Sequence, residues 1–188
     1  YDTRGRMLAQ AVTGTPGHVN AMAASVQHFI AKYPLATMGE GDVYLTNDPW
    51  LGTGHLNDFT VVTPTWRNGE IVALFACTTH VVDVGGRGFG PDARQVYEEG
   101  INIPIMPLAL GGDMNRMVLD IIAHNVRNPV EVEGDLYSLV ACNAVGSKRL
   151  VSMMDEFGLA SIDGLADHII DASRKGMAVE IAKLPNGV

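Results

Sequence analysis

The feature that most constrains this chain is a hairpin signature in its first half. Two runs rich in β-branched residues, Phe59–Thr65 and Ile71–Thr79, flank the dipeptide Asn68-Gly69. Asn-Gly between two such runs is the strongest short-range signal for a two-residue β-turn. The sequence therefore predicts two antiparallel strands, and the strand ends far from the turn must lie side by side.

Side chains with metal-ligand and acid–base chemistry occur at that far end. His55 and Asp58 stand where the first strand begins, and His80 and Asp83 stand where the second strand ends. Neutral imidazoles and a carboxylate suit Zn²⁺, Mn²⁺ or Fe²⁺ and leave positions open for water or substrate. From spacing alone, the alternative is that these residues only cap strand ends and form hydrogen bonds to loops.

The register of the hairpin bears on this site. If Arg67 pairs with Glu70 and the ladder is regular, Asp58 lies opposite residue 79 and one step away from His80. A β-bulge, or pairing that ends before the site, would bring the two side chains together. The hairpin thus predicts that the Asp58 and His80 side chains lie close together, and it does not define how they would coordinate a metal ion.

Other polar residues are candidates for supporting roles. Asp83 is expected to orient an imidazole or to shuttle a proton. His18 lies in a Gly/Pro-rich loop at a helix start, where it either faces the site as a catalytic residue or belongs to a surface loop. Asp48, in Asn-Asp-Pro, is a candidate for substrate binding, although an Asx-turn is the simpler interpretation. His124 is another, with capping of a helix end as the alternative.

The segment Gly85–Pro91 is rich in glycine and is expected to be a loop. It matches neither a phosphate-binding P-loop nor a dinucleotide fingerprint. A loop next to a site can act as a lid, so Gly85 and Gly86 are candidates for contact with substrate.

Outside the hairpin, the pattern predicts a mixed α/β fold. Short strands are expected over residues 7–11 and 42–45, and apolar spacings of three and four predict a helix from Val19 to just before Pro34. The run from Ile101 to Pro107 is expected to be extended because its two prolines disfavour a helix.

The second half of the chain is expected to be helical. Apolar stripes predict three helices, the first capped by Asp113, the second ending at Gly158 and the third capped by Ser161. The chain is thus expected to comprise a mixed α/β segment at 1–112 that carries the site and a helical segment at 113–188. Both are expected to form part of one larger domain.

The composition of the chain limits the classes of partner that it is expected to bind. The formal net charge of −8 argues against nucleic acid or an anionic membrane surface, because phosphate binding needs clustered Lys and Arg. Cys77 and Cys142 lie in apolar runs and are expected to be reduced core residues of a cytoplasmic protein. The first residue is not Met, and the chain is expected to be a piece of a longer protein without a signal peptide.

Several blocks, in this order, resemble the hydantoinase B/oxoprolinase family. They are Y-D-T-R-G-R-M-L-A-Q-A, P-G-H-V-N-A-M, G-D-V-Y-L-T-N-D-P-W, G-T-G-H-L-N-D-F-T-V-V-T-P, T-T-H-V-V-D-V-G-G and G-D-L-Y-S-L-V-A-C-N-A. The resemblance runs through nearly the whole chain, although members of the family are considerably longer. Many members read G-G-T-H-L-P-D where this chain reads G-T-G-H-L-N-D, so the resemblance leaves the substrate open.

The resemblance implies a B-type subunit that works with an A-type partner of actin-like ATPase fold. That partner uses ATP and Mg²⁺ to phosphorylate the substrate, and the carboxylase relatives hold a divalent metal with residues matching His55, Asp58 and His80. The expected function is ATP-dependent opening of small cyclic amides, such as hydantoins or 5-oxoproline, within a hetero-oligomer. The alternatives are a subunit of an ATP-dependent ketone carboxylase of the acetone or acetophenone type, and a non-catalytic assembly domain.

Overall fold

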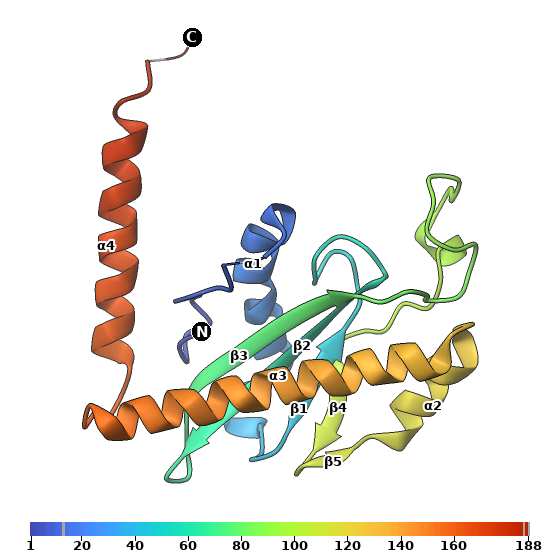
Figure 1. Ribbon diagram of the computed structural model, residues 1–188, viewed down its shortest axis with the longest axis horizontal. Helices are drawn as coiled ribbons and strands as arrows, with labels where there is room; N and C mark the ends of the chain where they lie inside the picture. Colours follow the sequence, from blue (N-terminus) through green and yellow to red (C-terminus); the bar gives the residue numbers. More distant parts are fainter. Residues whose placement is uncertain (13, 186, 188) are drawn as a thin grey trace.

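The computed structural model describes residues 1–12, 14–185 and 187, which form a five-stranded antiparallel sheet with helices on both faces (Figure 1). The strand order is β3-β2-β1-β4-β5. The strands are β1 Val43–Thr46, β2 Asp58–Arg67, β3 Glu70–His80, β4 Met106–Leu110 and β5 Asp113–Met114. The helices are α1 Pro16–Lys32, α2 Arg116–Asn125, α3 Pro129–Glu156 and α4 Asp163–Ile181, with short 3-10 turns η1 at Leu35–Thr37 and η2 at Val96–Glu98. The predicted mixed α/β fold, with the hairpin in the first half and helices in the second, is confirmed.

The central strands supply apolar side chains to both faces of the sheet. Successive side chains of a strand point to opposite faces. Tyr44 and Val62 accordingly pack with the α1 residues Val26 and Phe29, whereas their neighbours on the strands join a cluster with residues of α2 and α3. The helix α1 therefore covers one face of the sheet, and α2 and α3 cover the other (Figure 1).

The hairpin turn forms as the sequence predicts. Asn68 and Gly69 both adopt positive φ angles, 53° and 82°, and Arg67 pairs with Glu70. A two-residue turn with both φ angles positive matches the right-handed twist of the flanking strands, and Asn and Gly tolerate that backbone conformation at low cost.

A β-bulge then changes the register. Thr65 lies opposite Ala73, where a regular ladder would place Val72, and the shift falls next to this pair. Every later pair moves by one residue, so Asp58 lies directly opposite His80. The bulge is one of the two arrangements expected to bring these side chains together, and it aims them at the same point.

The expected strand at residues 7–11 is wrong. Among the described residues, this segment has no strand neighbour and runs as coil, with Leu8 half-buried beside Met154 and Ile162. A strand needs a partner for its backbone hydrogen bonds, and a five-residue apolar pattern cannot reveal whether one exists.

The expected helices form, but two of the expected caps differ. Asn115, not Asp113, caps α2, because its side chain accepts a hydrogen bond from the Val118 N–H. Asp113 lies in β5 instead. Ser161 accepts a hydrogen bond of 2.9 Å from the Asp163 N–H, one residue before the N-cap position of α4. Both differences are shifts of one or two residues in a polar stretch, where several side chains can cap equally well.

The helix α4 extends away from the sheet (Figure 1). Near its start, Ala166 is buried, and Asp167 pairs with Arg4 and Arg6 at 2.8 and 2.6 Å. Throughout 1–12, 14–185 and 187, no helix combines the length and the apolar character that a bilayer crossing requires.

Candidate metal centre

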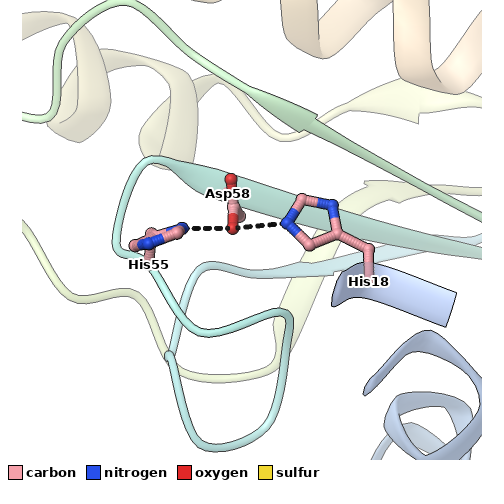
Figure 2. Close-up of side chains that lie close together, drawn as sticks. All are labelled: His18, His55 and Asp58. Atoms are coloured by element: carbon pink, nitrogen blue, oxygen red, sulfur yellow. Dashed lines mark hydrogen bonds and ion pairs between the residues drawn. The ribbon is translucent and has the colours of Figure 1, made fainter. Parts of the chain in front are cut away.

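The centre is built around the carboxylate of Asp58, whose side chain is fully buried. Its Oδ2 lies 3.1 Å from His55 Nδ1 and 3.3 Å from His18 Nε2 (Figure 2). Its Oδ1 lies 2.8 Å from His80 Nδ1. Burying a carboxylate is costly unless its charge is compensated. Three imidazoles thus surround a carboxylate that needs positive charge or hydrogen-bond donors.

Three separate elements deliver these imidazoles. His18 stands in the first turn of α1, and His80 is the last residue of β3. His55 is held by a turn before β2, in which the Asp58 N–H donates a hydrogen bond of 3.1 Å to the His55 carbonyl. Because a turn, a bulged strand and a helix start meet here, residues up to 62 positions apart in sequence share one site.

The imidazoles differ in how much of each is open to solvent. The side chains of His55 and His80 are 52% and 42% exposed, whereas that of His18 is 23% exposed. The Asp58 carboxylate at the base of the centre is therefore buried, whereas His55 and His80 form a solvent-exposed rim that water and small molecules can reach.

The donors suit a divalent transition metal. The ligand atoms of His18, His55 and Asp58 all lie within 4.8 Å of one another. Nitrogen and oxygen ligands that share one ion at about 2.0–2.2 Å are themselves separated by roughly 3 Å. The nitrogen–oxygen separations of 2.8 to 3.3 Å in this centre agree with that spacing. His80 belongs to the expected ligand set and His18 does not, so the choice of ligands among the four residues stays a prediction.

Phe89, from the glycine-rich segment, packs against the centre. Its ring centroid lies 5.6 Å from that of His55 and 4.9 Å from that of His80, in edge-to-face geometry. Reasoning from the sequence missed this residue, although it is the single aromatic side chain in Gly85–Pro91. The expected loop thus contacts the site through an aromatic ring.

Asp83 faces Arg127, which precedes α3. Its Oδ1 accepts hydrogen bonds of 2.6 Å from Arg127 Nη1 and 3.1 Å from the Gly85 N–H, and its Oδ2 accepts one from the Arg127 N–H. Burial raises the pKa of the Asp83 carboxyl, but these backbone N–H groups and the guanidinium outweigh burial and hold the pKa below its usual value. These contacts favour a role in holding the loop, and the expected catalytic role stays a prediction.

The two glycines after Asp83 allow a close approach of backbone. A Cβ on Gly85 would lie 2.3 Å from the Asn125 carbonyl oxygen, and one on Gly86 would lie 2.5 Å from the Glu98 carbonyl oxygen. Both residues have positive φ, 80° and 56°. Here glycine is required by packing within the chain, while the expected contact with substrate stays a prediction.

The two other candidates for substrate binding make local contacts. Asp48 Oδ1 accepts a hydrogen bond of 2.9 Å from the Trp50 N–H, which is the Asx-turn that the sequence suggested. His124 lies exposed in the last turn of α2, with its Nδ1 2.8 Å from the Asp120 carbonyl oxygen. Neither contact bears on a role in binding substrate, which stays a prediction for both.

Comparisons of this chain with known proteins agree on a single family. The family model described as hydantoinase B/oxoprolinase matches residues 1–188. Caprolactamase subunit beta of Pseudomonas jessenii is 29% identical over 153 residues, which cover 80% of this chain and 26% of that protein. The crystal structure of the ATP-dependent caprolactamase from the same organism superimposes with a TM-score of 0.84 at 26% identity, covering 92% of this chain and 30% of that one.

An acetone carboxylase, in a nucleotide-free structure, has a similar fold. Its TM-score is 0.75 at 24% identity, and the match covers 88% of this chain and 22% of that one. The chain spans 26 to 32% of the length of the first curated relatives that it matches.

Proposed function

The chain belongs to the hydantoinase B/oxoprolinase family, and we propose on that premise that it is part of a subunit of an ATP-dependent hydrolase opening small cyclic amides. The observation that carries the proposal is the buried Asp58 carboxylate with three imidazoles at 2.8 to 3.3 Å. The similarity to an ATP-dependent caprolactamase supports the substrate class, because caprolactam is a cyclic amide. Hydantoins and 5-oxoproline belong to the same chemical class.

His55, Asp58 and His80 would hold a divalent cation such as Zn²⁺, Mn²⁺ or Fe²⁺. Bound there, the ion would polarise an amide carbonyl oxygen or lower the pKa of a water molecule. The solvent-exposed rim formed by His55 and His80 supports this assignment, because a substrate needs access to one side of the ion.

The chain's own residues would position the reacting groups. The Nδ1 atoms of the His55 and His80 rings both face the Asp58 carboxylate, and these two nitrogens and the carboxylate oxygens would be the atoms that hold the ion. His18 is the least exposed of the three imidazoles, and its Nε2 lies 3.3 Å from Asp58, so it is suited to hold or transfer a proton. Phe89 would shield one side of the two exposed rings from water.

A second subunit would supply the activation step. The relative's name, caprolactamase subunit beta, implies a further subunit in that enzyme. For this chain, we assign the partner to the A-type class with an actin-like ATPase fold, which would use ATP and Mg²⁺ to phosphorylate the substrate. The Asp83–Arg127 pair would keep the glycine-rich segment in place beside the site.

The test is an assay of the intact protein together with its A-type partner. ATP turnover is measured with 5-oxoproline, hydantoin and caprolactam, and separately with acetone and bicarbonate. We expect turnover with at least one cyclic amide, near-complete loss of it in Asp58→Asn, and retention in His168→Ala, which changes an exposed histidine on α4. Turnover with acetone and bicarbonate alone, or full activity in Asp58→Asn, would overturn the proposal.

A further inference from the structure

The two cysteines lie on neighbouring elements at one edge of the sheet, where α3 packs against β3. The strand β3 is an edge strand, and Cys77 lies on the face of it that packs with α2 and α3. Its Sγ donates a hydrogen bond of 3.3 Å to the carbonyl oxygen of Leu139 on α3. Cys142 follows three residues later on the same helix. Both thiols are free in the described part of the chain.

Helix geometry brings the Cys142 side chain toward Cys77. Residues three apart lie on the same side of a helix, and each side chain leans over the turn that precedes its own Cα. Cys142 therefore covers the turn that contains Leu139, whose carbonyl oxygen the Cys77 thiol contacts. Burial raises the pKa of the Cys77 thiol well above its usual value, and the Cys142 thiol, as a charged neighbour and a hydrogen-bond partner, raises it further.

Contacts that involve neither thiol fix α3 at this place on β3. Asn143, the residue after Cys142, donates to the Val61 carbonyl at 3.2 Å and to the Phe75 carbonyl at 3.3 Å. Val61 is the residue that pairs with Cys77 across the hairpin. The packing of the helix on the sheet therefore holds the two cysteines near each other.

The two thiols differ in their access to solvent. The sequence predicts that both are core residues, but Cys142 is exposed and Cys77 is half-buried. An oxidant therefore reaches Cys142 first, whereas its raised pKa keeps the Cys77 thiol protonated and unreactive on its own. An accessible thiol that reacts first, next to a second thiol that resolves it, is the arrangement of a two-cysteine oxidation site.

We propose that Cys142 and Cys77 form such a site, at which hydrogen peroxide creates a disulfide between α3 and β3. The Cys142 sulfur attacks a peroxide oxygen, the O–O bond breaks, and a sulfenic acid and one water molecule form. The Cys77 sulfur then attacks the Cys142 sulfur, the S–O bond breaks, and the hydroxyl leaves as water with the Cys77 proton. Two thiols thus lose two electrons and two protons, and the peroxide is reduced to two water molecules.

This site lies on the opposite face of the sheet from the candidate metal centre. Cys77 precedes His80 by three residues on β3, and successive side chains of a strand point to opposite faces. The disulfide would therefore involve none of the candidate metal ligands. The inference is independent of the proposed function.

The experiment treats the intact, reduced protein with hydrogen peroxide at slightly alkaline pH and then blocks the remaining thiols with N-ethylmaleimide. Tryptic peptides are mapped by mass spectrometry without reduction. Trypsin places Cys77 in the peptide 68–87 and Cys142 in the peptide 128–148. We expect these two peptides to appear joined, with a mass lower by two hydrogens than their sum, and to separate again on addition of dithiothreitol.

Three variants distinguish a specific pair from general oxidation of thiols. Cys142→Ser should yield no joined peptides. In the matched control, Cys142→Ser with Ala141→Cys, an exposed thiol stays on α3 but points away from the turn side that Cys77 contacts, so the joined peptides should again be lost. In Cys77→Ser, Cys142 should proceed to sulfinic and sulfonic acids, because no second thiol traps the sulfenic acid.

Thermal denaturation tests whether the two cysteines are already in position. A disulfide that closes a long loop restricts the unfolded chain, so the oxidised protein should have a higher Tm than the reduced protein. Oxidation of Cys142 without joined peptides, an equal yield of them from the variant with the relocated thiol, or a lower Tm after oxidation would overturn the proposal. Because these measurements need neither metal nor ATP, their failure is distinguishable from failure of the proposed hydrolase.

Discussion

Replacing Arg127 by Ala should destabilise the protein by releasing the glycine-rich segment from the start of α3. The guanidinium donates to Asp83 Oδ1 at 2.6 Å, to the Gly85 carbonyl at 3.3 Å, and to the Gly86 carbonyl. The Asp83 side chain is 7% exposed, so in the variant a nearly buried carboxylate retains only two backbone N–H partners.

The size of the effect follows from these contacts. A hydrogen bond to a charged group contributes about 1.5–3 kcal/mol, and one to a neutral carbonyl about 1 kcal/mol. The Arg127 side chain is 59% exposed, so water replaces part of what is lost. We expect a loss of about 2 kcal/mol in the free energy of unfolding, or roughly 4–8 °C in Tm for a chain of this size.

The stability difference between the unchanged protein and Arg127→Ala should also depend on pH, in a direction set by the pKa of Asp83. The pKa of Asp83 is lowered in the folded protein, because its hydrogen bonds and Arg127 outweigh the effect of burial. A depressed pKa contributes stability that is present above the unfolded-state pKa, near 3.8, and is lost as pH falls through the folded-state value. The difference between the two proteins should be complete at pH 7 and should shrink below about pH 4.

Urea denaturation at pH 7 and at steps toward pH 3 measures the difference. Arg174→Ala is the matched control, because Arg174 is 76% exposed and forms a surface pair with Asp171. That control should change the free energy of unfolding by less than about 0.5 kcal/mol. A similarly small effect of Arg127→Ala at pH 7, or a difference that persists undiminished at pH 3, would refute the reasoning.

Three further changes test other parts of the structure. Asn143→Ala should cost about 1–3 kcal/mol in denaturant unfolding, because the buried amide lies 3.1 to 3.3 Å from three acceptors on β2 and β3; a cost under about 0.5 kcal/mol would contradict this anchoring role. Gly85→Ala should lower the Tm more than Gly88→Ala, since both have positive φ but only the first would place a Cβ 2.3 Å from a backbone oxygen; equal losses would show that packing is irrelevant there. Loss of a residue that only orients a metal ligand typically lowers metal affinity roughly 10- to 100-fold. In metal titrations, His80→Ala should lower the affinity by more than this range, and His18→Ala should stay within it. The reverse order would identify His18 as the ligand.

The hairpin was predictable because its determinants are local. Asn68-Gly69 is sufficient to define the turn, and the β-branched runs define the strands. The extra residue at Val72 was not predictable in position, since nothing in the Ile71–Thr79 run marks one residue as unpaired. Even so, the one-step mismatch between Asp58 and His80 predicted either a bulge or pairing that ends before the site.

The site was predictable only in part. Histidines next to the hairpin could be assigned to it, but His18 lies 40 positions before Asp58, and whether it faces the site depends on how α1 packs. Arg127 and Phe89 carried no sequence signal that ties them to Asp83 or to the histidines. Their positions depend on tertiary packing, as does the lack of a neighbouring strand for residues 7–11 within the described part of the chain.

The most direct test is the metal content of the intact protein. The protein is saturated with Zn²⁺, Mn²⁺ or Fe²⁺, freed of loosely bound ions by gel filtration, and analysed by plasma mass spectrometry. We predict close to one ion per chain, with loss in Asp58→Asn and retention in Asp155→Asn, which changes an exposed carboxylate paired with Arg67. No retained ion in the unchanged protein, or the same content in Asp58→Asn, would contradict a metal centre built on Asp58.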